Sequence, residues 1–169
     1  MKIIGEVVVY TDSLSKDLGA IIGVNGKLPS YSEEEINKFK ENTIGKRCIM
    51  GGVTYRSLSK PLSDRTNIVL TKRNYTSVDG VIFCKSKEEV MELVSQPEDE
   101  SDIVVIGGKE IYNLFKDEID LWRVSYMSKQ LELKEGDKVT RLPDEIFGRN
   151  RIVNSTRYET FRSVLRLKY

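Results

Sequence analysis

The segment from Asp102 to Phe115 has the sequence DIVVIGGKEIYNLF and decides the fold of the chain. Its four consecutive aliphatic residues, Ile103 to Ile106, predict a strand buried on both faces, as in a parallel sheet covered by helices. Two glycines follow, and apolar residues then recur at helical spacing, so we predict a strand, a glycine turn and a helix. Ligands of open α/β sheets bind beyond the carboxyl ends of such strands, and we expect a ligand pocket beside Gly107 and Gly108.

The glycine pair by itself leaves two interpretations open. The two residues can simply form a tight turn between strand and helix, or they can let backbone approach a bound ligand. The dinucleotide-binding fingerprint G-x-G-x-x-G is incomplete here because its third glycine is absent. The segment therefore does not match the standard Rossmann pattern.

Length and charge restrict the class of protein. A chain of 169 residues is large enough to bury a substantial core, and we expect one domain over residues 1–169. The formal net charge of +1 gives no field that favours nucleic acid or an anionic membrane, so we expect neither partner. No apolar run is long enough for a membrane span, and Glu6 interrupts the first apolar run, which predicts a strand rather than a signal peptide. We expect a cytoplasmic protein.

The residue types available for catalysis are also restricted. The chain has no histidine, which excludes Ser-His and Cys-His nucleophiles, imidazole zinc sites and histidine acid catalysis. Acid or base chemistry must come from a carboxylate, a lysine, a tyrosine or bound water, and we expect no metal site. Cys48 and Cys84 each end an apolar, strand-like run, where a small buried hydrophobic residue is the expected role.

Strands and helices alternate over most of the chain. We predict strands over residues 3–10, 45–52, 66–70, 81–84, 102–107, 121–127 and 157–167. We predict further helices over residues 32–42, 53–58 and 86–94. This order implies an α/β fold with parallel pairing and right-handed crossovers, completed by antiparallel strands after Leu121. Residues 11–31 are predicted to form a long loop that packs over the protein like a lid.

A second glycine pair, Gly51-Gly52, also follows a predicted strand and precedes a predicted helix. Two such turns in one sheet would place two helix N-termini at the same edge, an arrangement suited to a diphosphate. The cluster Thr71-Lys72-Arg73 ends the next strand and could hold another phosphate. The alternative is that these basic residues are simply solvated.

Three acidic residues, Glu33 to Glu35, begin the first predicted helix. Acidic side chains are favoured there by the helix dipole. The pattern Ser32-x-x-Glu35 is a capping box that would occupy Glu35, but Ser30-x-x-Glu33 fits the same motif and would leave Glu35 free. A free carboxyl beside the apolar helix face would have a raised pKa and could bind a heterocyclic cation. Both interpretations remain open from spacing alone.

An ordered series of short motifs resembles the dihydrofolate reductase family over residues 20 to 143. The matching residues, in order, are Gly23, Leu28-Pro29, Phe39-Lys40, Asn42-Thr43, Ile49-Met50-Gly51, Thr54, Pro61-Leu62, Arg65, Asn67-Ile68, Val105-Ile106-Gly107-Gly108, Tyr112 and Gly136-Asp137. The resemblance implies a mostly parallel eight-stranded central sheet with an antiparallel C-terminal edge and about four flanking helices.

The resemblance also implies a folate site. Glu35 corresponds to the carboxylate that pairs with the pterin ring, Ser125 to the hydroxyl beside it, and Arg65 to the clamp for the folate α-carboxylate, a task that suits guanidinium. Val7 is the implied pterin contact of the first strand, with Val9 as its alternative. The remaining implied substrate contacts are Ile36, Phe39, Leu58, Lys60, Leu62, Ile106 and Tyr112.

The implied cofactor is NADPH. The family's glycine pair, joined there by a cis peptide, corresponds to Gly107-Gly108, and the reader of the NADPH 2′-phosphate to Thr71-Lys72. Residues 21–28 correspond to the mobile lid. The other implied cofactor contacts are Ile22, Gly23, Asn25, Lys27, Leu28, Val53, Thr54, Ser57, Lys85, Lys109, Glu110 and Ile111.

The activity that this resemblance implies is reduction of 7,8-dihydrofolate to 5,6,7,8-tetrahydrofolate, by hydride transfer to C6 and protonation of N5. The hydride chemistry belongs to the cofactor. A member of this family would serve tetrahydrofolate biosynthesis and one-carbon metabolism, would bind antifolate inhibitors, and is expected to be a monomer.

Four departures from the family pattern are visible. Ser30 stands where the family usually has tryptophan, and Gly52-Val53 replaces an Arg-containing pair that meets the cofactor phosphates. Glu6 to Val9 replaces the small residues of the first strand, and Ser63-Asp64 replaces Pro-Gly. These changes predict weaker ordering of the substrate and a preference for NADPH that depends mainly on Lys72.

Two alternative functions remain compatible with the fold. A pyrimidine reductase of riboflavin-type metabolism would share the sheet and the cofactor site, but Arg65 would have no glutamyl tail to bind there. A folate- or nucleotide-binding protein with weak turnover would also share the fold, and the absent tryptophan and the altered pair Gly52-Val53 keep this alternative open.

Overall fold

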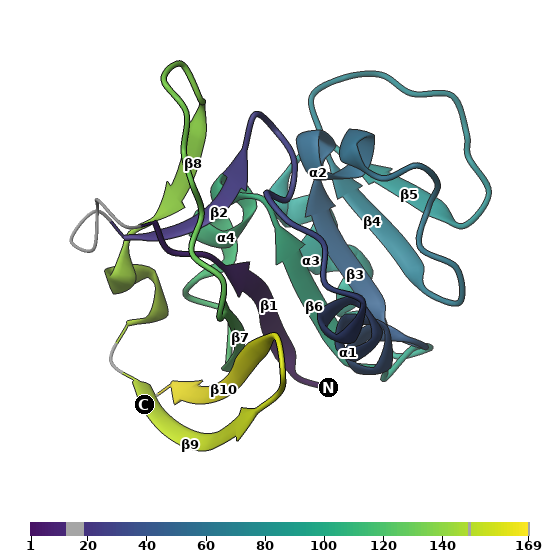
Figure 1. Ribbon diagram of the computed structural model, residues 1–169. Coiled ribbons are helices and arrows are strands. Elements are labelled where there is room, and N and C mark those ends of the chain that lie inside the picture. Colours follow the sequence, from purple (N-terminus) through teal and green to yellow (C-terminus); the bar gives the residue numbers. More distant parts are fainter. Residues whose placement is uncertain (13–18, 149, 169) are drawn as a thin grey trace.

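The computed structural model describes residues 1–12, 19–148 and 150–168, and the chain folds around an eight-stranded sheet (Figure 1). The strand order across this sheet is β5-β4-β3-β6-β1-β7-β10-β9, and β2 and β8 form a separate two-stranded sheet. The strands are β1 (Ile3–Val9), β2 (Ala20–Val24), β3 (Arg47–Gly51), β4 (Thr66–Leu70), β5 (Val81–Cys84), β6 (Ile103–Gly107), β7 (Leu121–Met127), β8 (Val139–Leu142), β9 (Asn150–Arg157) and β10 (Phe161–Lys168).

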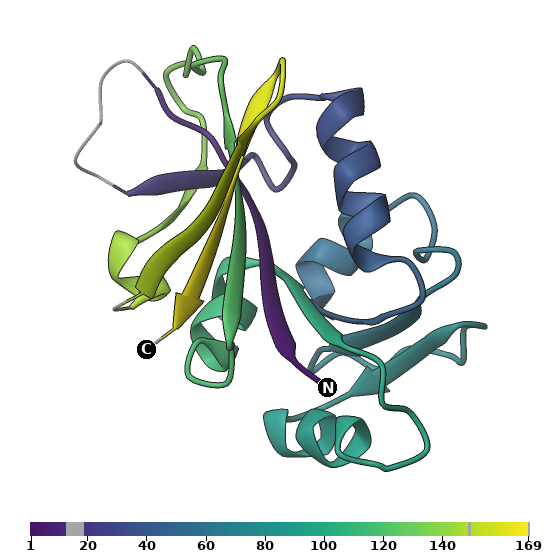
Figure 2. The ribbon, with the colours of Figure 1, turned by 90° about the horizontal axis from the view of Figure 1, so that it is seen from below.

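The pairing confirms the predicted mixed sheet. Strand β1 lies between β6 and β7 and is parallel to both, and β3, β4 and β5 continue the parallel part. Strand β10 is antiparallel to β7, and β9 is antiparallel to β10 at the edge (Figure 2). The predicted segment from Asp102 to Phe115 forms β6 and α4 beside β1, at the centre of the sheet.

Four α-helices accompany the strands: α1 (Glu33–Thr43), α2 (Gly52–Ser57), α3 (Lys87–Val94) and α4 (Lys109–Phe115), with a 3₁₀ helix η1 (Asp144–Phe147). Ser32 and Ser86 cap α1 and α3, since each hydroxyl accepts a hydrogen bond from the backbone N–H three residues later. These caps explain why both helices begin one residue after the predicted starts.

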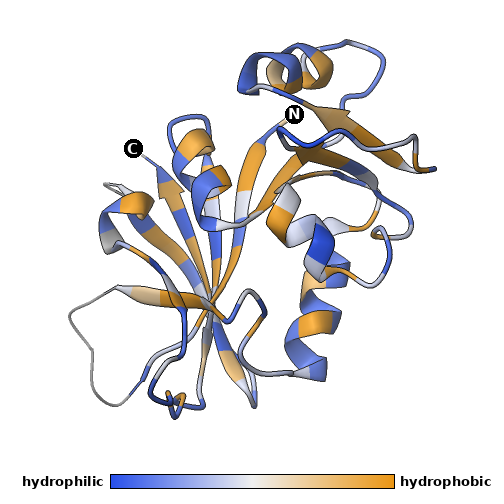
Figure 3. Cartoon of the chain, turned by 90° about the horizontal axis from the view of Figure 1, so that it is seen from above, coloured by the Kyte–Doolittle hydropathy of each residue, from blue (hydrophilic) through white to orange (hydrophobic). Residues whose placement is uncertain are grey.

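Successive side chains along each strand point to opposite faces of the sheet, so the buried core is divided between the two faces. One buried cluster joins strand residues such as Ile49 and Val105 to Ile111 and Phe115 of α4. A second cluster on the opposite face centres on Cys48 and includes the strand residues Met50, Val69 and Val104, with Leu58 and Leu62 packed against it. Figure 3 shows this hydrophobic content in the central strands, with hydrophilic residues on the outer helix faces.

The long loop predicted over residues 11–31 is partly wrong, because Ala20–Val24 forms β2 and pairs with β8. The part of the loop at residues 13–18 lies outside the described residues. Strands β8 and β9 were not predicted from the sequence, and the closing strand begins at Phe161 instead of residue 157. In the hairpin between β9 and β10, the backbone N–H of Tyr158 donates to the carbonyl of Phe161.

Both cysteines are buried free thiols. Burial raises the pKa of Cys48 to about 12, so this thiol stays protonated and packs as a small hydrophobic group. Among the helices of the described residues, none is both long enough and apolar enough to cross a bilayer.

Candidate active site

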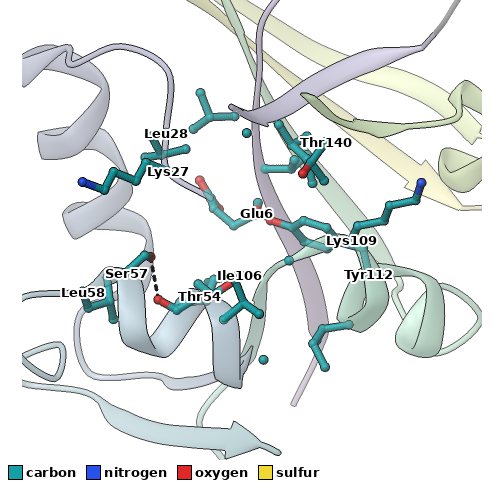
Figure 4. Close-up of a pocket in the computed structure, with 18 of the residues that line it drawn as sticks. Glu6, Lys27, Leu28, Thr54, Ser57, Leu58, Ile106, Lys109, Tyr112 and Thr140 are labelled. Atoms are coloured by element: carbon teal, nitrogen blue, oxygen red, sulfur yellow. Dashed lines mark hydrogen bonds between the residues drawn. The ribbon is translucent and has the colours of Figure 1, made fainter. Parts of the chain in front are cut away.

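A cavity of about 510 Å³ lies at the carboxyl ends of β3 and β6, beside the middle of β1. Helices α1, α2 and α4 and the β2 segment supply its other sides. In Figure 4, the Lys27-Leu28 turn lies on one side of this cavity, and Tyr112, Lys109 and Thr140 lie on the other. This is the position at which open α/β sheets bind ligands.

Most of the predicted site residues line this cavity. They are Val7, Ile22, Gly23, Lys27, Leu28, Glu35, Ile36, Phe39, Val53, Thr54, Ser57, Leu58, Leu62, Ile106, Gly108, Lys109, Glu110, Ile111 and Tyr112. Residues from four distant parts of the sequence therefore meet at one site.

Glu35 is the predicted catalytic carboxyl, and only 5% of the residue is exposed. The Ser32 hydroxyl accepts a hydrogen bond from the backbone N–H of Glu35, at 3.2 Å, and so caps the helix without the Glu35 side chain. The carboxyl is hydrogen-bonded instead to Ser125 of β7. Half of the capping box is formed, and the carboxyl of Glu35 remains available to the cavity.

The environment of Glu35 favours its protonated form. Burial raises its pKa from 4.5 to about 7, the nearby carboxylate of Glu6 raises it too, and the hydrogen bond from Ser125 opposes both. An acid with a pKa close to neutrality can hold or release a proton under physiological conditions. Ser125 itself is buried and is not part of the cavity lining.

Gly51, Gly52, Gly107 and Gly108 form a glycine rim on the opposite side of the cavity. The Gly107-Gly108 peptide bond is cis. Gly107 has a φ of 111°, and a Cβ there would lie 3.1 Å from the ring of Tyr112. The carbonyl oxygen of Gly107 lies 3.8 Å from the position of a Cβ on Gly51, so the two predicted glycine turns meet.

The predicted basic cluster, Thr71-Lys72-Arg73, lies outside the cavity lining, and hydrogen bonds hold its side chains against the neighbouring loop. The Lys72 ammonium donates to the carbonyl of Lys85 at 3.0 Å, and the Lys85 ammonium donates to the side chain of Asn74 at 2.9 Å. The Thr71 hydroxyl accepts the backbone N–H of Arg73 at 3.2 Å. These contacts join the ends of β4 and β5 next to the glycine rim.

Arg56 of α2 is a cation at this edge that the sequence did not identify. A Cβ on Gly52 would lie 3.2 Å from a guanidinium nitrogen of Arg56 and 2.9 Å from the Thr71 hydroxyl. Arg56 also donates to the Tyr75 hydroxyl at 3.2 Å. Because Gly52 has no side chain, Arg56 and Thr71 occupy the space above it.

The other predicted residues outside the cavity lining differ in their surroundings. Lys60 is exposed, and Arg65 is half-buried near Cys48. The side chain of Asn25 is bonded to Asp137 and to the backbone of Lys138, so it connects the β2 turn to the start of β8.

Gly51 and Gly52, predicted as a second glycine turn at this edge, also line the cavity, whereas sequence reasoning missed Glu6, Val8, Gly26, Leu70 and Thr140. The unusual member is Glu6, a carboxyl in the middle of an otherwise apolar central strand. Its interruption of the pattern IIGEVVV was the signal that could have identified it.

The position of the absent tryptophan is partly covered by Tyr10. Its hydroxyl donates to the carbonyl of Ser30 at 3.1 Å. Tyr10 is buried, which raises the pKa of its hydroxyl, and the charge of Glu35 acts in the same direction. A phenol therefore lies in the electrostatic field of the carboxyl at the start of α1.

Comparisons with known proteins agree with this geometry. The family model for dihydrofolate reductase matches residues 14–145. The dihydrofolate reductase of Haemophilus influenzae is 31% identical over 115 residues, which are 68% of this chain and 69% of that protein. The enzyme of Bacillus subtilis is 33% identical over 125 residues, 72% of this chain and 69% of that protein.

A solved structure also matches the fold over almost its whole length. It is dihydrofolate reductase from Enterococcus faecalis, complexed with NADP(H) and RAB-propyl, with a TM-score of 0.79, 21% identity, and coverage of 98% of this chain and 95% of that one. The extent of the family match, together with these relatives, leads to one conclusion: the chain belongs to the dihydrofolate reductase family.

Proposed function

We propose that this protein reduces 7,8-dihydrofolate to 5,6,7,8-tetrahydrofolate with NADPH. The observation that carries the proposal is that one cavity is lined both by Glu35, from the first helix, and by Gly108, which directly follows Gly107 at the end of a distant strand. The net reaction saturates the N5–C6 double bond of the pterin, with the hydride added at C6 and a proton at N5.

The glycine rim fits the cofactor. The carbonyl of Gly107 approaches Gly51, and a Cβ at Gly51, Gly52 or Gly107 would lie 2.9 to 3.1 Å from side-chain atoms, so these positions are packed too tightly for a side chain. Gly51, Gly52 and Gly108 therefore line the cavity with backbone alone. Thr54 and Ser57 of α2 and Lys109 of α4 also line the cavity and would hold the diphosphate and nicotinamide portions. When bound, NADPH supplies the hydride.

At the pterin end, Glu35 would bind the ring edge through hydrogen bonds and hold a proton close to it. Ser125 fixes the orientation of the Glu35 carboxyl by its hydrogen bond. Ile36, Phe39 and Leu58 would enclose the rings, because they line the cavity from α1 and the end of α2. Their apolar surface would exclude water from the reacting atoms.

The tail of the substrate would extend past Leu62, toward Arg65 and Lys60. The Nε atom of Arg65 is buried and has no hydrogen-bond partner among the described residues. A guanidinium with an unused donor suits a carboxylate ligand such as the glutamyl tail. We assign Arg65 this role, with the exposed Lys60 as a secondary contact.

The 2′-phosphate of NADPH would bind beside the glycine rim. Thr71, Lys72 and Lys85 lie at the ends of β4 and β5, and Arg56 adds a cation above Gly52. Arg56 would supply the positive charge that the family's arginine provides at the position of Gly52-Val53.

The test is the oxidation of NADPH, followed by absorbance near 340 nm, with purified protein and dihydrofolate. We expect oxidation that depends on both compounds and stops when an antifolate is added. A folded protein that binds folate without oxidising NADPH would contradict the proposal and favour the binding-protein alternative.

We also propose that the protein acts as a monomer in the cytoplasm. Two buried free thiols are typical of proteins from reducing compartments. Light scattering with size-exclusion chromatography gives the oligomeric state directly, and a dimer mass would contradict this part.

A further inference from the structure

Glu6 is a second carboxyl of the cavity and has no role in the function proposed above. It lies in the middle of β1, only 5% of the residue is exposed, and it lines the cavity together with Glu35. Figure 4 places it between the Lys27-Leu28 turn and Tyr112. The Tyr112 hydroxyl donates to the backbone carbonyl of Glu6 at 2.6 Å, which fixes this part of the strand.

The side chain of Glu6 is only partly satisfied. The amide of Asn42 donates to its Oε1 at 2.8 Å, and a guanidinium nitrogen of Arg123 lies 3.5 Å from its Oε2. Within the part of the chain that the structure describes, Oε2 has no hydrogen-bond partner. A buried carboxyl whose second oxygen has only a 3.5 Å ion pair to Arg123 contributes little to stability, so the residue calls for another explanation.

The surroundings of the two carboxyls differ in a way that decides which one keeps the proton. Burial is the largest influence on Glu6 and raises its pKa, while Asn42, Arg123 and Lys46 act in the opposite direction and favour its charged form. For Glu35, only the hydrogen bond from the Ser125 hydroxyl favours the charged form. When two carboxyls interact, the better-supported one ionises first and its charge holds the proton on the other.

The groups that act on this pair come from every neighbouring element. They are Arg123 of β7, Lys46 between α1 and β3, Tyr10 after β1, Tyr112 of α4 and Cys48 of β3. Burial keeps Tyr112 and Cys48 neutral, and it raises the pKa of Tyr10 as well, so Arg123 and Lys46 are the cations of the group.

We infer that Glu6 is a positioning residue whose negative charge, held by Asn42 and Arg123, makes the neighbouring Glu35 carboxyl hold its proton up to near-neutral pH. The inference deepens the reductase function proposed above and rests on it. Glu6 acts through Glu35, so its effect is on the pH range in which Glu35 carries its proton.

The direct test is a ¹³C NMR titration of the Glu35 carboxyl in the ligand-free protein, with Glu35→Gln to assign the resonance. Glu6→Gln should move the midpoint of Glu35 down by about one pH unit, since a neighbouring charge in a protein interior has an effect of that order. The midpoint should stay above that of an ordinary glutamate, because burial remains. An unchanged midpoint would overturn the inference.

Two matched variants separate charge from structure. Glu6→Asp keeps the charge and should retain most of the wild-type midpoint. Glu41→Gln removes an exposed carboxylate of α1, the helix that carries Glu35. Glu41 pairs with Lys38, and its removal should leave the midpoint of Glu35 unchanged. A shift as large in Glu41→Gln as in Glu6→Gln would show a general charge effect and contradict the inference.

Glu6→Gln leaves Arg123 without its charged partner and could prevent folding. The double variant Glu6→Gln/Arg123→Gln removes both charges and should show the same lowering of the Glu35 midpoint. A wild-type midpoint in this folded variant would also overturn the inference.

The titration needs no turnover, so it fails or succeeds independently of the NADPH assay, which tests the proposed function. In the active protein, kcat should fall at high pH as Glu35 loses its proton, and in Glu6→Gln this fall should occur at lower pH, by the same amount as the Glu35 midpoint.

Discussion

The two ends of the cavity suit their proposed ligands by different physical means. At the pterin end, Glu35 and Glu6 are both 95% buried, and burial together with their mutual repulsion raises the pKa of Glu35 to about 7. At the cofactor end, the glycine rim offers backbone, and exposed cations such as Lys72 lie beside it. Electrostatic effects are strong where water is excluded and weak where it is not. Substitutions at the buried end should therefore have the larger effects.

The largest effect is expected from Glu35→Gln. Removing the group that holds the proton should lower kcat about 10²- to 10⁴-fold, the range for loss of an acid–base group. The fold should persist, because Ser32 caps α1 through the backbone N–H of Glu35 and not through its carboxyl. Steady-state kinetics with a circular dichroism melt would measure both. Wild-type kcat in the variant would contradict the assigned role.

The second effect is on stability as a function of pH. The pKa of Glu35 is raised from 4.5 in the folded protein, so its stabilising contribution is complete below about pH 4.5 and lost as the pH rises to about 7. At about 1.4 kcal/mol per pKa unit, the loss is about 3 kcal/mol. Urea unfolding at pH 5 and pH 8 should show this loss in the wild type and a smaller one in Glu35→Gln. Equal losses in both proteins would exclude Glu35 as its source.

A smaller effect is expected at the glycine rim. Gly107→Ala places a Cβ at a φ of 111° and 3.1 Å from Tyr112, which should cost about 1–3 kcal/mol of unfolding free energy and weaken NADPH binding. Gly136→Ala is the matched control, since its φ is also positive but nothing lies within 4 Å of the added Cβ. Denaturant unfolding and fluorescence titration with NADPH measure the two quantities. NADPH affinity that is the same in both variants would argue against contact at Gly107.

The smallest effect is expected from the exposed cations. Lys72→Ala and Arg56→Ala should each raise the KM for NADPH about 5- to 10-fold, equivalent to about 1 kcal/mol, and leave the KM for NADH unchanged. Lys134→Ala removes an exposed lysine on the turn before β8 and should change neither constant. Parallel increases for NADPH and NADH would show that the cations do not read the 2′-phosphate.

The difference between the two ends also explains what the sequence predicted well. The central strands β3, β4 and β6 are buried on both faces, so their apolar runs identify them as strands. Their ends gave the position of the cavity, because ligands of such sheets bind there. The resemblance to the family then supplied the individual residues that line it.

The parts that were missed depend on distant partners. Strand β2 forms because Ala20–Val24 meets β8, which lies more than 100 residues later, and neither segment has a long periodic pattern. Strand β9 is an exposed edge with a mostly polar sequence. Arg56 and Glu6 gain their significance only from three-dimensional neighbours, Gly52 for one and Glu35 for the other.

The central claim is that hydride crosses this cavity from the glycine rim to a pterin held at Glu35. It is tested most directly with NADPH deuterated at both C4 positions, dihydrofolate and the purified protein, followed by mass spectrometry of the folate product. We predict tetrahydrofolate with one deuterium at C6, and at most a trace of it with Glu35→Gln. Unlabelled product, or the same labelled yield from both proteins, would contradict the account.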